Sequence, residues 1–179
     1  ESMPDRDFDW ENRPHFVELC RQIAPDDPTL LDIVCTAIDA PTAYESNVLA
    51  PRGTPDTWTQ WYYMPMEALL EGLRSRSLLK TVDWTCSSDE LISAAASLLR
   101  RYERSADVSV EFVRGGDRPD EHRRVLFALT MCLESLGYRL ATIELGASYD
   151  LILLPIDRYV RFARAFRSIS YHPLKEWGE

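Results

Sequence analysis

The sequence predicts one α+β domain over residues 1–179, with a small, mostly antiparallel sheet that helices cover. Two strand-like runs, 138–145 and 148–154, are joined by a short link that begins at Gly146, which predicts a C-terminal β-hairpin. Strongly periodic helical segments separate the strand-like runs, as expected for an α+β fold. With 179 residues, of which 45% are hydrophobic, the chain has enough apolar material for one core.

The N-terminal part predicts two amphipathic helices. Asn12 is a candidate cap for the first helix, because Pro14 then falls in its opening turn. The second helix is expected to begin with Asp27 as the cap and Pro28 as the first helical residue. Its apolar residues recur with the helical period: Leu30, Leu31, Val34, Cys35 and Ile38.

Residues 40–57 are predicted to form a long surface loop. They contain three prolines and one glycine and show no sustained hydrophobic period. Loops of this length are uncommon in compact domains and often carry function. This loop is therefore the first candidate for a binding region.

The middle of the chain predicts two helices and two strands. A helix that begins near Pro65 is followed by 78–84, whose composition is typical of a strand. Ser87 and Glu90 form a capping box that opens the next helix. In 108–112, apolar and polar residues alternate, which predicts a strand with one solvated face.

The C-terminal part predicts a helix, the hairpin and a last helix. The first of these helices is expected over 119–136, and Gly137 ends it. Within the hairpin, residues 151–154 are apolar at consecutive positions, so both faces of this strand should be covered and the strand should be central. A helix over 157–168 completes the predicted order.

The chain carries a net charge of −9, and the acidic excess lies in its first third. Residues 1–60 hold 12 acidic and 4 basic residues. This charge argues against a nucleic-acid ligand, because phosphate contacts depend on Lys and Arg. It favours a basic protein partner attracted by electrostatic steering, although solubility alone also accounts for an acidic surface.

Nothing in the sequence is typical of a membrane, metal or cofactor site. No apolar run approaches the roughly 20 residues of a membrane-spanning helix, and the acidic N-terminus lacks the apolar run of a signal peptide. Four cysteines and three histidines are scattered without the close pairs that metal sites use. Glycine-rich nucleotide-binding motifs are missing too. We expect a cytoplasmic protein with reduced cysteines, no metal and no cofactor.

Acidic residues near strand ends are the candidates for catalysis. Asp83, beside Trp84, lies at the end of a predicted strand, and a neighbouring indole can raise a carboxyl pKa by desolvation. Glu144 and Asp150 flank the hairpin link and could face each other, as paired carboxylates do in glycosidases. The simpler interpretations are a strand-end acid that accepts backbone hydrogen bonds, and the solvated end of a hairpin.

Aromatic residues crowd the segment that follows the predicted loop. Trp58, Trp61 and Tyr62 supply the large apolar area common in binding hot spots, although two tryptophans three residues apart suit a core face equally well. The arginines that recur along 158–167 are interpreted as a solvated helix face. We predict a partner-binding surface in which the aromatic cluster is joined by three residues in or next to the loop: Asp39, Tyr44 and Glu45.

Several features from about residue 66 onward recur together. They are a Leu-rich helix, the strand end Val82-Asp83-Trp84, the SSDELISAA helix, the segment LESLGYRLATIELGASYDLILLP and the closing helix. In these features the chain resembles an uncharacterised bacterial α+β domain family. The resemblance implies a small bacterial domain without an assigned activity, and it transfers no catalytic residue.

Two functions are compatible with these observations. Immunity proteins, which neutralise a neighbour's toxin, are similarly acidic, compact and free of catalytic motifs, and this analogy predicts a non-enzymatic inhibitor of a basic toxin. The alternative is a small enzyme or ligand-binding domain that uses Asp83 and a second carboxylate in a cleft. A structure distinguishes the inhibitor from the enzyme, because the enzyme needs Asp83 in a deep pocket beside a second titratable group.

Overall fold

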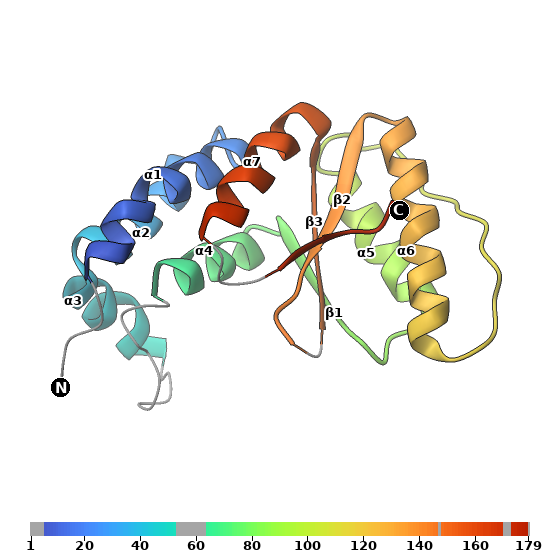
Figure 1. Cartoon of the computed structure of the whole chain (residues 1–179), viewed down its shortest axis with the longest axis horizontal. Coiled ribbons are helices and arrows are strands. Elements are labelled where there is room, and N and C mark those ends of the chain that lie inside the picture. Colours follow the sequence, from blue (N-terminus) through green and yellow to red (C-terminus); the bar gives the residue numbers. More distant parts are fainter. Residues whose placement is uncertain (1–5, 53–63, 147, 170–172, 179) are drawn as a thin grey trace.

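The structure is a computed structural model that describes residues 6–52, 64–146, 148–169 and 173–178 (Figure 1). The α-helices are α1 (Arg6–Ile23), α2 (Pro28–Asp39), α3 (Pro41–Tyr44), α4 (Met64–Ser75), α5 (Ser88–Leu99), α6 (Arg118–Ser135) and α7 (Ile156–Ile169). A π-helical turn η1 (Glu45–Leu49) and a 3-10 turn η2 (Ala50–Arg52) continue α3. The strands are β1 (Leu79–Asp83), β2 (Tyr138–Ile143), β3 (Ser148–Pro155) and β4 (Leu174–Glu176).

The four strands form one antiparallel sheet in the order β1-β3-β2-β4. β2 and β3 are the predicted hairpin, in which Tyr138 is opposite Pro155 and Ile143 is opposite Asp150. The prediction that 151–154 form a covered central strand is confirmed, since all four residues are buried in β3, between β1 and β2. β4 was not predicted, because three residues are too few to show a hydrophobic period.

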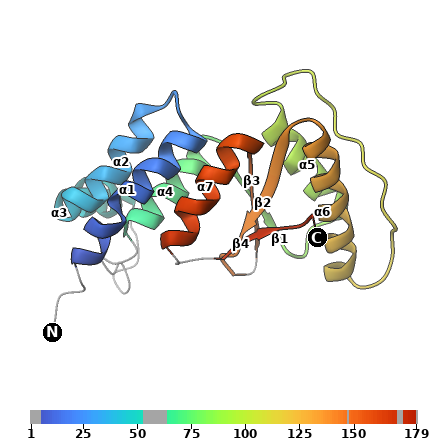
Figure 2. The same ribbon diagram turned by 45° about the horizontal axis from the view of Figure 1, so that its top comes forward.

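Helices cover both faces of the sheet, and each face has its own core (Figures 1 and 2). α1, α2, α4 and α7 pack on the face where Ile152 and Leu154 of β3 are buried. α5 and α6 pack on the other face, with Leu151 and Leu153. Alternate residues of β3 thus enter different cores, which explains why the strand is apolar at consecutive positions. The predicted α+β class is confirmed.

Local sequence signals place the ends of α5 and α6. Ser87 Oγ accepts from the Glu90 N–H at 3.3 Å and the Glu90 carboxylate accepts from the Ser87 N–H at 2.6 Å, so the predicted capping box is formed. Asp117 caps α6 by accepting from the Asp120 N–H at 2.9 Å. Gly137 has a φ of 92°, the left-handed conformation that commonly ends a helix.

α1 begins earlier than predicted. It starts at Arg6, and the proposed cap Asn12 is a buried residue inside the helix. Pro14 is consequently an interior residue, which removes one intrahelical hydrogen bond. α1 packs closely against α7 and buries Phe16 and Leu19 in the core, which offsets this loss, so tertiary contacts override the local proline signal.

The prediction of a loop over 40–57 is wrong for residues 41–52, which are helical as α3, η1 and η2. Residues 53–57 lie outside the described part of the chain. Pro41 occupies the first turn of α3, where a missing N–H costs no bond. Tyr44 and Leu49 are both buried and lie five residues apart, which fits the i→i+5 hydrogen bonds of a π-helical turn. Because this spacing differs from the 3.6-residue period of an α-helix, the sequence pattern did not indicate a helix here.

Residues 108–112 do not form the predicted strand. The chain there belongs to no helix and pairs with no strand of the sheet. Val108 is buried, and Val110 and Phe112 pack against the core of α5 and α6, while Ser109 and Glu111 are exposed. A segment laid over two helices therefore shows the same alternation as a strand with one solvated face.

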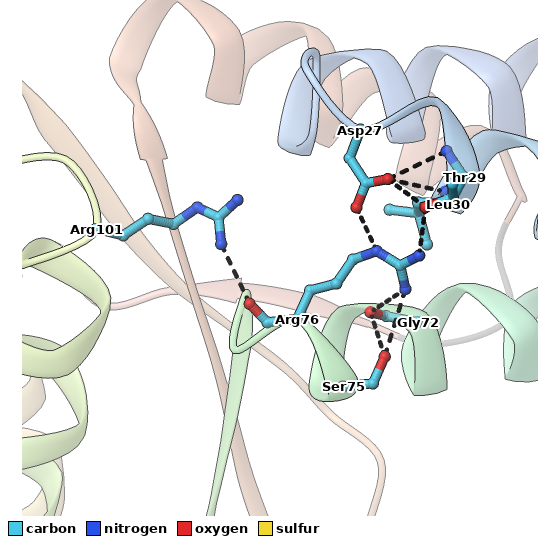
Figure 3. A network of polar contacts seen from close by, with 7 residues as sticks. All are labelled: Asp27, Thr29, Leu30, Gly72, Ser75, Arg76 and Arg101. Carbon is cyan, nitrogen blue, oxygen red and sulfur yellow. Dashed lines mark hydrogen bonds and ion pairs between the residues drawn. The ribbon is translucent and has the colours of Figure 1, made fainter.

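Asp27 joins the start of α2 to the end of α4 (Figure 3). Its Oδ1 accepts from the Thr29 N–H at 3.1 Å, as predicted for the cap, and its Oδ2 accepts from the Arg76 guanidinium. Arg76 also donates to Thr29 Oγ1 at 2.9 Å and to the Gly72 carbonyl oxygen at 3.1 Å. The bond from the Thr29 hydroxyl, followed by the bond from Arg76, lowers the pKa of Asp27 from 3.8 to about 2.

Replacing Asp27 with asparagine is expected to remove a pH-dependent part of the stability. The ionised carboxylate stabilises the folded chain fully above its unfolded-state pKa of 3.8, and this contribution is lost as the pH falls to about 2. Wild type should therefore be more stable than Asp27→Asn at about pH 6 and lose that advantage between about pH 4 and pH 2. Chemical denaturation across this range measures the difference, and a constant difference would contradict the assigned role.

Candidate protein-binding groove

A groove of about 940 Å³ runs along the exposed face of α6. α6 forms its floor, the segment 109–113 forms one wall, and residues 175–177 form the other. In both views the connection between α5 and α6 follows α6 on the side away from β2, while the chain after β4 reaches α6 from the sheet (Figures 1 and 2). The larger apolar side chains of the lining are Val110, Phe112, Val113, Phe127, Met131 and Trp177.

Three large hydrophobic side chains in this groove are exposed to solvent. Val113 is 71% exposed, Phe127 is 44% exposed and Met131 is 50% exposed. Single exposed apolar residues are common on protein surfaces, but several in one concave site are typical of binding surfaces and make this groove the candidate site. The other exposed large hydrophobics of the described residues do not line the groove: Trp84, Leu136 and Val160.

α6 is apolar on two faces. Its inner face is buried against α5 and the sheet through Leu126, Leu129 and Leu133. Its outer face carries Phe127 and Met131, four residues apart. A surface helix needs only one apolar stripe to pack on its own domain, so the second stripe is not explained by packing within the described part of the chain.

The wall formed by 109–113 is held at its C-terminal end by α6. Arg124 Nε donates to the Val113 carbonyl oxygen at 2.8 Å. The Gly115 N–H donates to Glu121 Oε2 at 3.0 Å. Side chains of α6, and not a neighbouring strand, therefore fix the course of this segment.

The opposite wall is built on Trp177. Its Nε1–H donates to Thr142 Oγ1 at 2.9 Å, and its ring centre lies 6.3 Å from that of Tyr149. The Lys175 ammonium lies 4.0 Å from the centre of the Trp177 ring, a cation–π contact. A second hollow of about 530 Å³ adjoins the groove and shares Arg123, Lys175 and Trp177 with it.

His122, on the inner face of α6, is buried beside Cys86 and Tyr149, a group that the sequence did not reveal. Its Nε2 lies 2.8 Å from the Cys86 carbonyl oxygen and must donate to it, so its Nδ1 accepts from the Tyr149 hydroxyl at 3.2 Å. Burial, with smaller effects of Glu90 and Asp83, raises the pKa of the Cys86 thiol to about 11. A raised pKa disfavours the thiolate, and His122 Nε2 donates to the Cys86 carbonyl oxygen and is not available as a base for the thiol, so the geometry does not support a nucleophilic Cys86.

Asp83 is exposed at the end of β1 and serves the turn that follows. Its Oδ1 accepts from the Thr85 hydroxyl at 2.5 Å and from the Thr85 N–H at 2.7 Å. These bonds, the hydroxyl first, lower the pKa of Asp83, whereas the sequence suggested a raised pKa beside Trp84. The indole of Trp84 is itself mostly in solvent and leaves the carboxylate hydrated.

Glu144 and Asp150 are not brought together as a carboxylate pair. Asp150 is completely buried on β3, where it accepts from Thr81 Oγ1 at 2.6 Å and from Ser148 Oγ at 2.8 Å. Arg74 Nη2 of α4 lies 3.9 Å from the same carboxylate. Glu144, by contrast, is exposed beyond the end of β2. Asp150 is therefore a core group and Glu144 is solvated, so one substrate would not contact both carboxylates.

The predicted partner-binding residues differ in their exposure. Asp39 is exposed, and Arg13 binds its carboxylate through two hydrogen bonds of 3.0 Å. Glu45 is exposed on η1. Tyr44 is buried in the core, which corrects its assignment to a surface contact. The aromatic part of that surface lies outside the described residues: Trp58, Trp61 and Tyr62.

Within the described ranges, no group of three or more His, Cys, Asp or Glu side chains is placed to hold a metal ion. None of the helices described above is both long and apolar enough to cross a membrane.

Comparison with known proteins identifies a family. The family described as a domain of unknown function, DUF6630, matches residues 15–173. This confirms the predicted resemblance to an uncharacterised domain family and extends it to nearly the whole chain. No curated protein and no solved structure matches the chain.

Proposed function

Because this chain belongs to the DUF6630 family, whose description assigns no activity, we propose from its geometry that it is a non-enzymatic protein-binding module. The proposed contact surface is the groove along α6. The observation that carries this proposal is the gathering of Val113, Phe127 and Met131, all exposed, in one groove over a second apolar face of the helix.

We further propose that the partner is a basic protein and that the chain acts as an inhibitor of the immunity type. The net charge of −9 and the acidic excess of residues 1–60 support this. Such a field speeds the encounter with a basic protein, after which buried apolar contacts provide most of the affinity. Trp58, Trp61 and Tyr62 stay a predicted contact with the same partner. The four free cysteines agree with a cytoplasmic location.

The alternative of a small enzyme has less support. Asp83 is bound to its own turn, and Asp150 is enclosed in the core. General acid–base catalysis needs groups that reach the same substrate. Asp83, Glu144 and Asp150 supply no such pair.

Negative charge in the groove is expected to abolish partner binding. In affinity capture from an extract of the source organism, Phe127→Glu/Met131→Glu should lose the protein that wild type retains. With that protein purified, the affinity should fall at least about 100-fold, as for the loss of two central apolar contacts. Because both side chains are exposed, the thermal midpoint should stay within about 2 °C of wild type.

Val160→Glu is the matched control, because Val160 is similarly exposed, at 46%, but lies on α7 outside the groove. It should leave the affinity unchanged. Raising the salt concentration should slow association of wild type with the partner, since exposed charges are screened beyond about 10 Å at 0.1 M salt. Equal partner retention by the groove variant and the control would contradict the proposal, and salt-independent association would contradict the basic partner.

A further inference from the structure

We propose that the occupant of the groove is an extended segment of the partner, which adds as a strand alongside residues 109–113 and places an acidic side chain against Lys175. This inference rests on the proposed function and names the chemistry of what enters the groove. Strand addition of this kind takes its affinity from main-chain hydrogen bonds and its specificity from sites for alternate side chains.

The backbone edge of 109–113 faces the groove. Neighbouring side chains of an extended chain point in opposite directions, so a cavity beside one face of the chain meets only alternate residues. All the residues from Ser109 to Val113 line this groove. Consecutive residues of an extended chain meet one cavity where the edge of the chain, with its N–H and C=O groups, borders it, and we infer this arrangement for 109–113.

That edge lacks a strand partner in the described part of the chain. Residues 107–113 make no backbone–backbone hydrogen bond to another described residue. The segment is nevertheless held in place, by buried Val108 at one end and by the bond from Arg124 to the Val113 carbonyl at the other. Its main-chain groups are thus presented in an ordered form, which lowers the entropy cost of pairing with an added strand.

The floor of the groove matches the spacing of a strand that runs along α6. Phe127 and Met131 are four residues apart, which corresponds to about 6 Å along a helix axis. Side chains on the same face of a strand are about 6.7 Å apart. Two successive same-face residues of the segment can therefore pack on Phe127 and Met131 in turn, while the segment stays beside 109–113. A helical segment would leave the main-chain groups of 109–113 without partners.

The charges of the groove favour an acidic residue near β4. Of the three basic side chains in the lining, Arg123 and Arg124 are paired with Asp120. Lys175 forms no ion pair with a described residue; its ammonium lies over the Trp177 ring, where it can also meet an acid of the partner. Glu176, on the same wall, is bound to Tyr159 and Arg167. Glu111, on the opposite wall, disfavours an acid at that side. This arrangement sets the orientation of the segment more than its affinity.

Displayed random peptides of about twelve residues, long enough to cover one strand-addition site, test this inference. Peptides are selected on the full chain and counter-selected on Phe127→Glu/Met131→Glu. We expect sequences with apolar residues at alternate positions and Asp or Glu near one end. Single N-methylation of the synthetic peptide should weaken binding at least about tenfold at every second position, because only alternate N–H groups pair with the wall.

The acidic position is tested by Lys175→Glu. This variant should bind the selected peptide about tenfold more weakly, and should regain affinity when the acid of the peptide is replaced with lysine. Arg161→Glu, with the same charge change at an exposed position of α7, is the control and should bind the peptide as wild type does. Equal effects of the two variants would overturn the contact with Lys175.

Three results would overturn strand addition. The first is that the selected peptides share apolar residues at helical spacing. The second is that the effect of N-methylation on peptide affinity does not alternate between positions. The third is that no selected peptide binds wild type better than Phe127→Glu/Met131→Glu. These results do not bear on the proposed function. That function is tested by whether wild type retains the natural partner and Phe127→Glu/Met131→Glu loses it.

Discussion

Replacing Asp150 with alanine is expected to lower the free energy of unfolding by about 3 kcal/mol. The carboxylate is completely buried on β3, where it accepts from Thr81 of β1 at 2.6 Å and from Ser148 at 2.8 Å. Arg74 of α4 lies 3.9 Å away, so the same group joins the helical layer to the sheet. Alanine would leave the Thr81 and Ser148 hydroxyls without their acceptor, remove the ion pair with Arg74 and open a cavity between β1, β3 and α4.

Two further variants separate the causes of this effect. Asp150→Asn keeps the volume and one acceptor, so it should cost about half as much as alanine. Glu144→Ala removes an exposed carboxylate beyond the neighbouring strand and should change the stability by less than about 0.5 kcal/mol. Urea denaturation measures all three, and a loss below about 1 kcal/mol for Asp150→Ala would contradict the assigned role.

His122→Ala is also expected to destabilise the chain by about 3 kcal/mol. The imidazole is buried, donates to the Cys86 carbonyl at 2.8 Å and accepts from the Tyr149 hydroxyl at 3.2 Å. Its loss leaves a cavity and two polar groups without partners. Because Tyr149 packs against Trp177 of the groove wall, partner affinity should fall as well.

Tyr149→Phe is the control for this second substitution. It keeps the aromatic ring and removes only the hydroxyl that His122 accepts from, so it should cost about 1 kcal/mol and leave the groove intact. If His122→Ala cost no more than Tyr149→Phe in the same denaturation experiment, the buried group would not support the helix and sheet as inferred.

The parts of the fold that follow from local chemistry could be predicted from the sequence. The consecutive apolar residues 151–154, in a short run that follows a glycine-containing link, indicated a central strand, because a strand covered on both faces is apolar at every position. The capping box of Ser87 and Glu90 and the cap of Asp27 each placed a helix start, since these bonds form within a few residues of the chain.

The groove could not be predicted, because its walls and floor come from segments far apart in the sequence. The alternation in 108–112 predicts a strand, and this prediction is wrong because the alternation has another physical origin, a segment packed against the core of α5 and α6. One signal was present: Phe127 and Met131 lie off the main apolar stripe of the helix predicted over 119–136. The burial of Asp150 likewise depends on Arg74 and Thr81, which the sequence does not place beside it.

Amide hydrogen exchange of the chain, alone and bound to its partner, tests the central claim that the partner binds in the groove along α6. The amides of 109–113 have no backbone partners among the described residues and should exchange rapidly in the free chain. We predict that the partner slows their exchange at least about 100-fold, together with that of 175–177. Slowed exchange confined to residues 39–63, with 109–113 unchanged, would place the partner on the predicted aromatic surface and contradict binding in the groove.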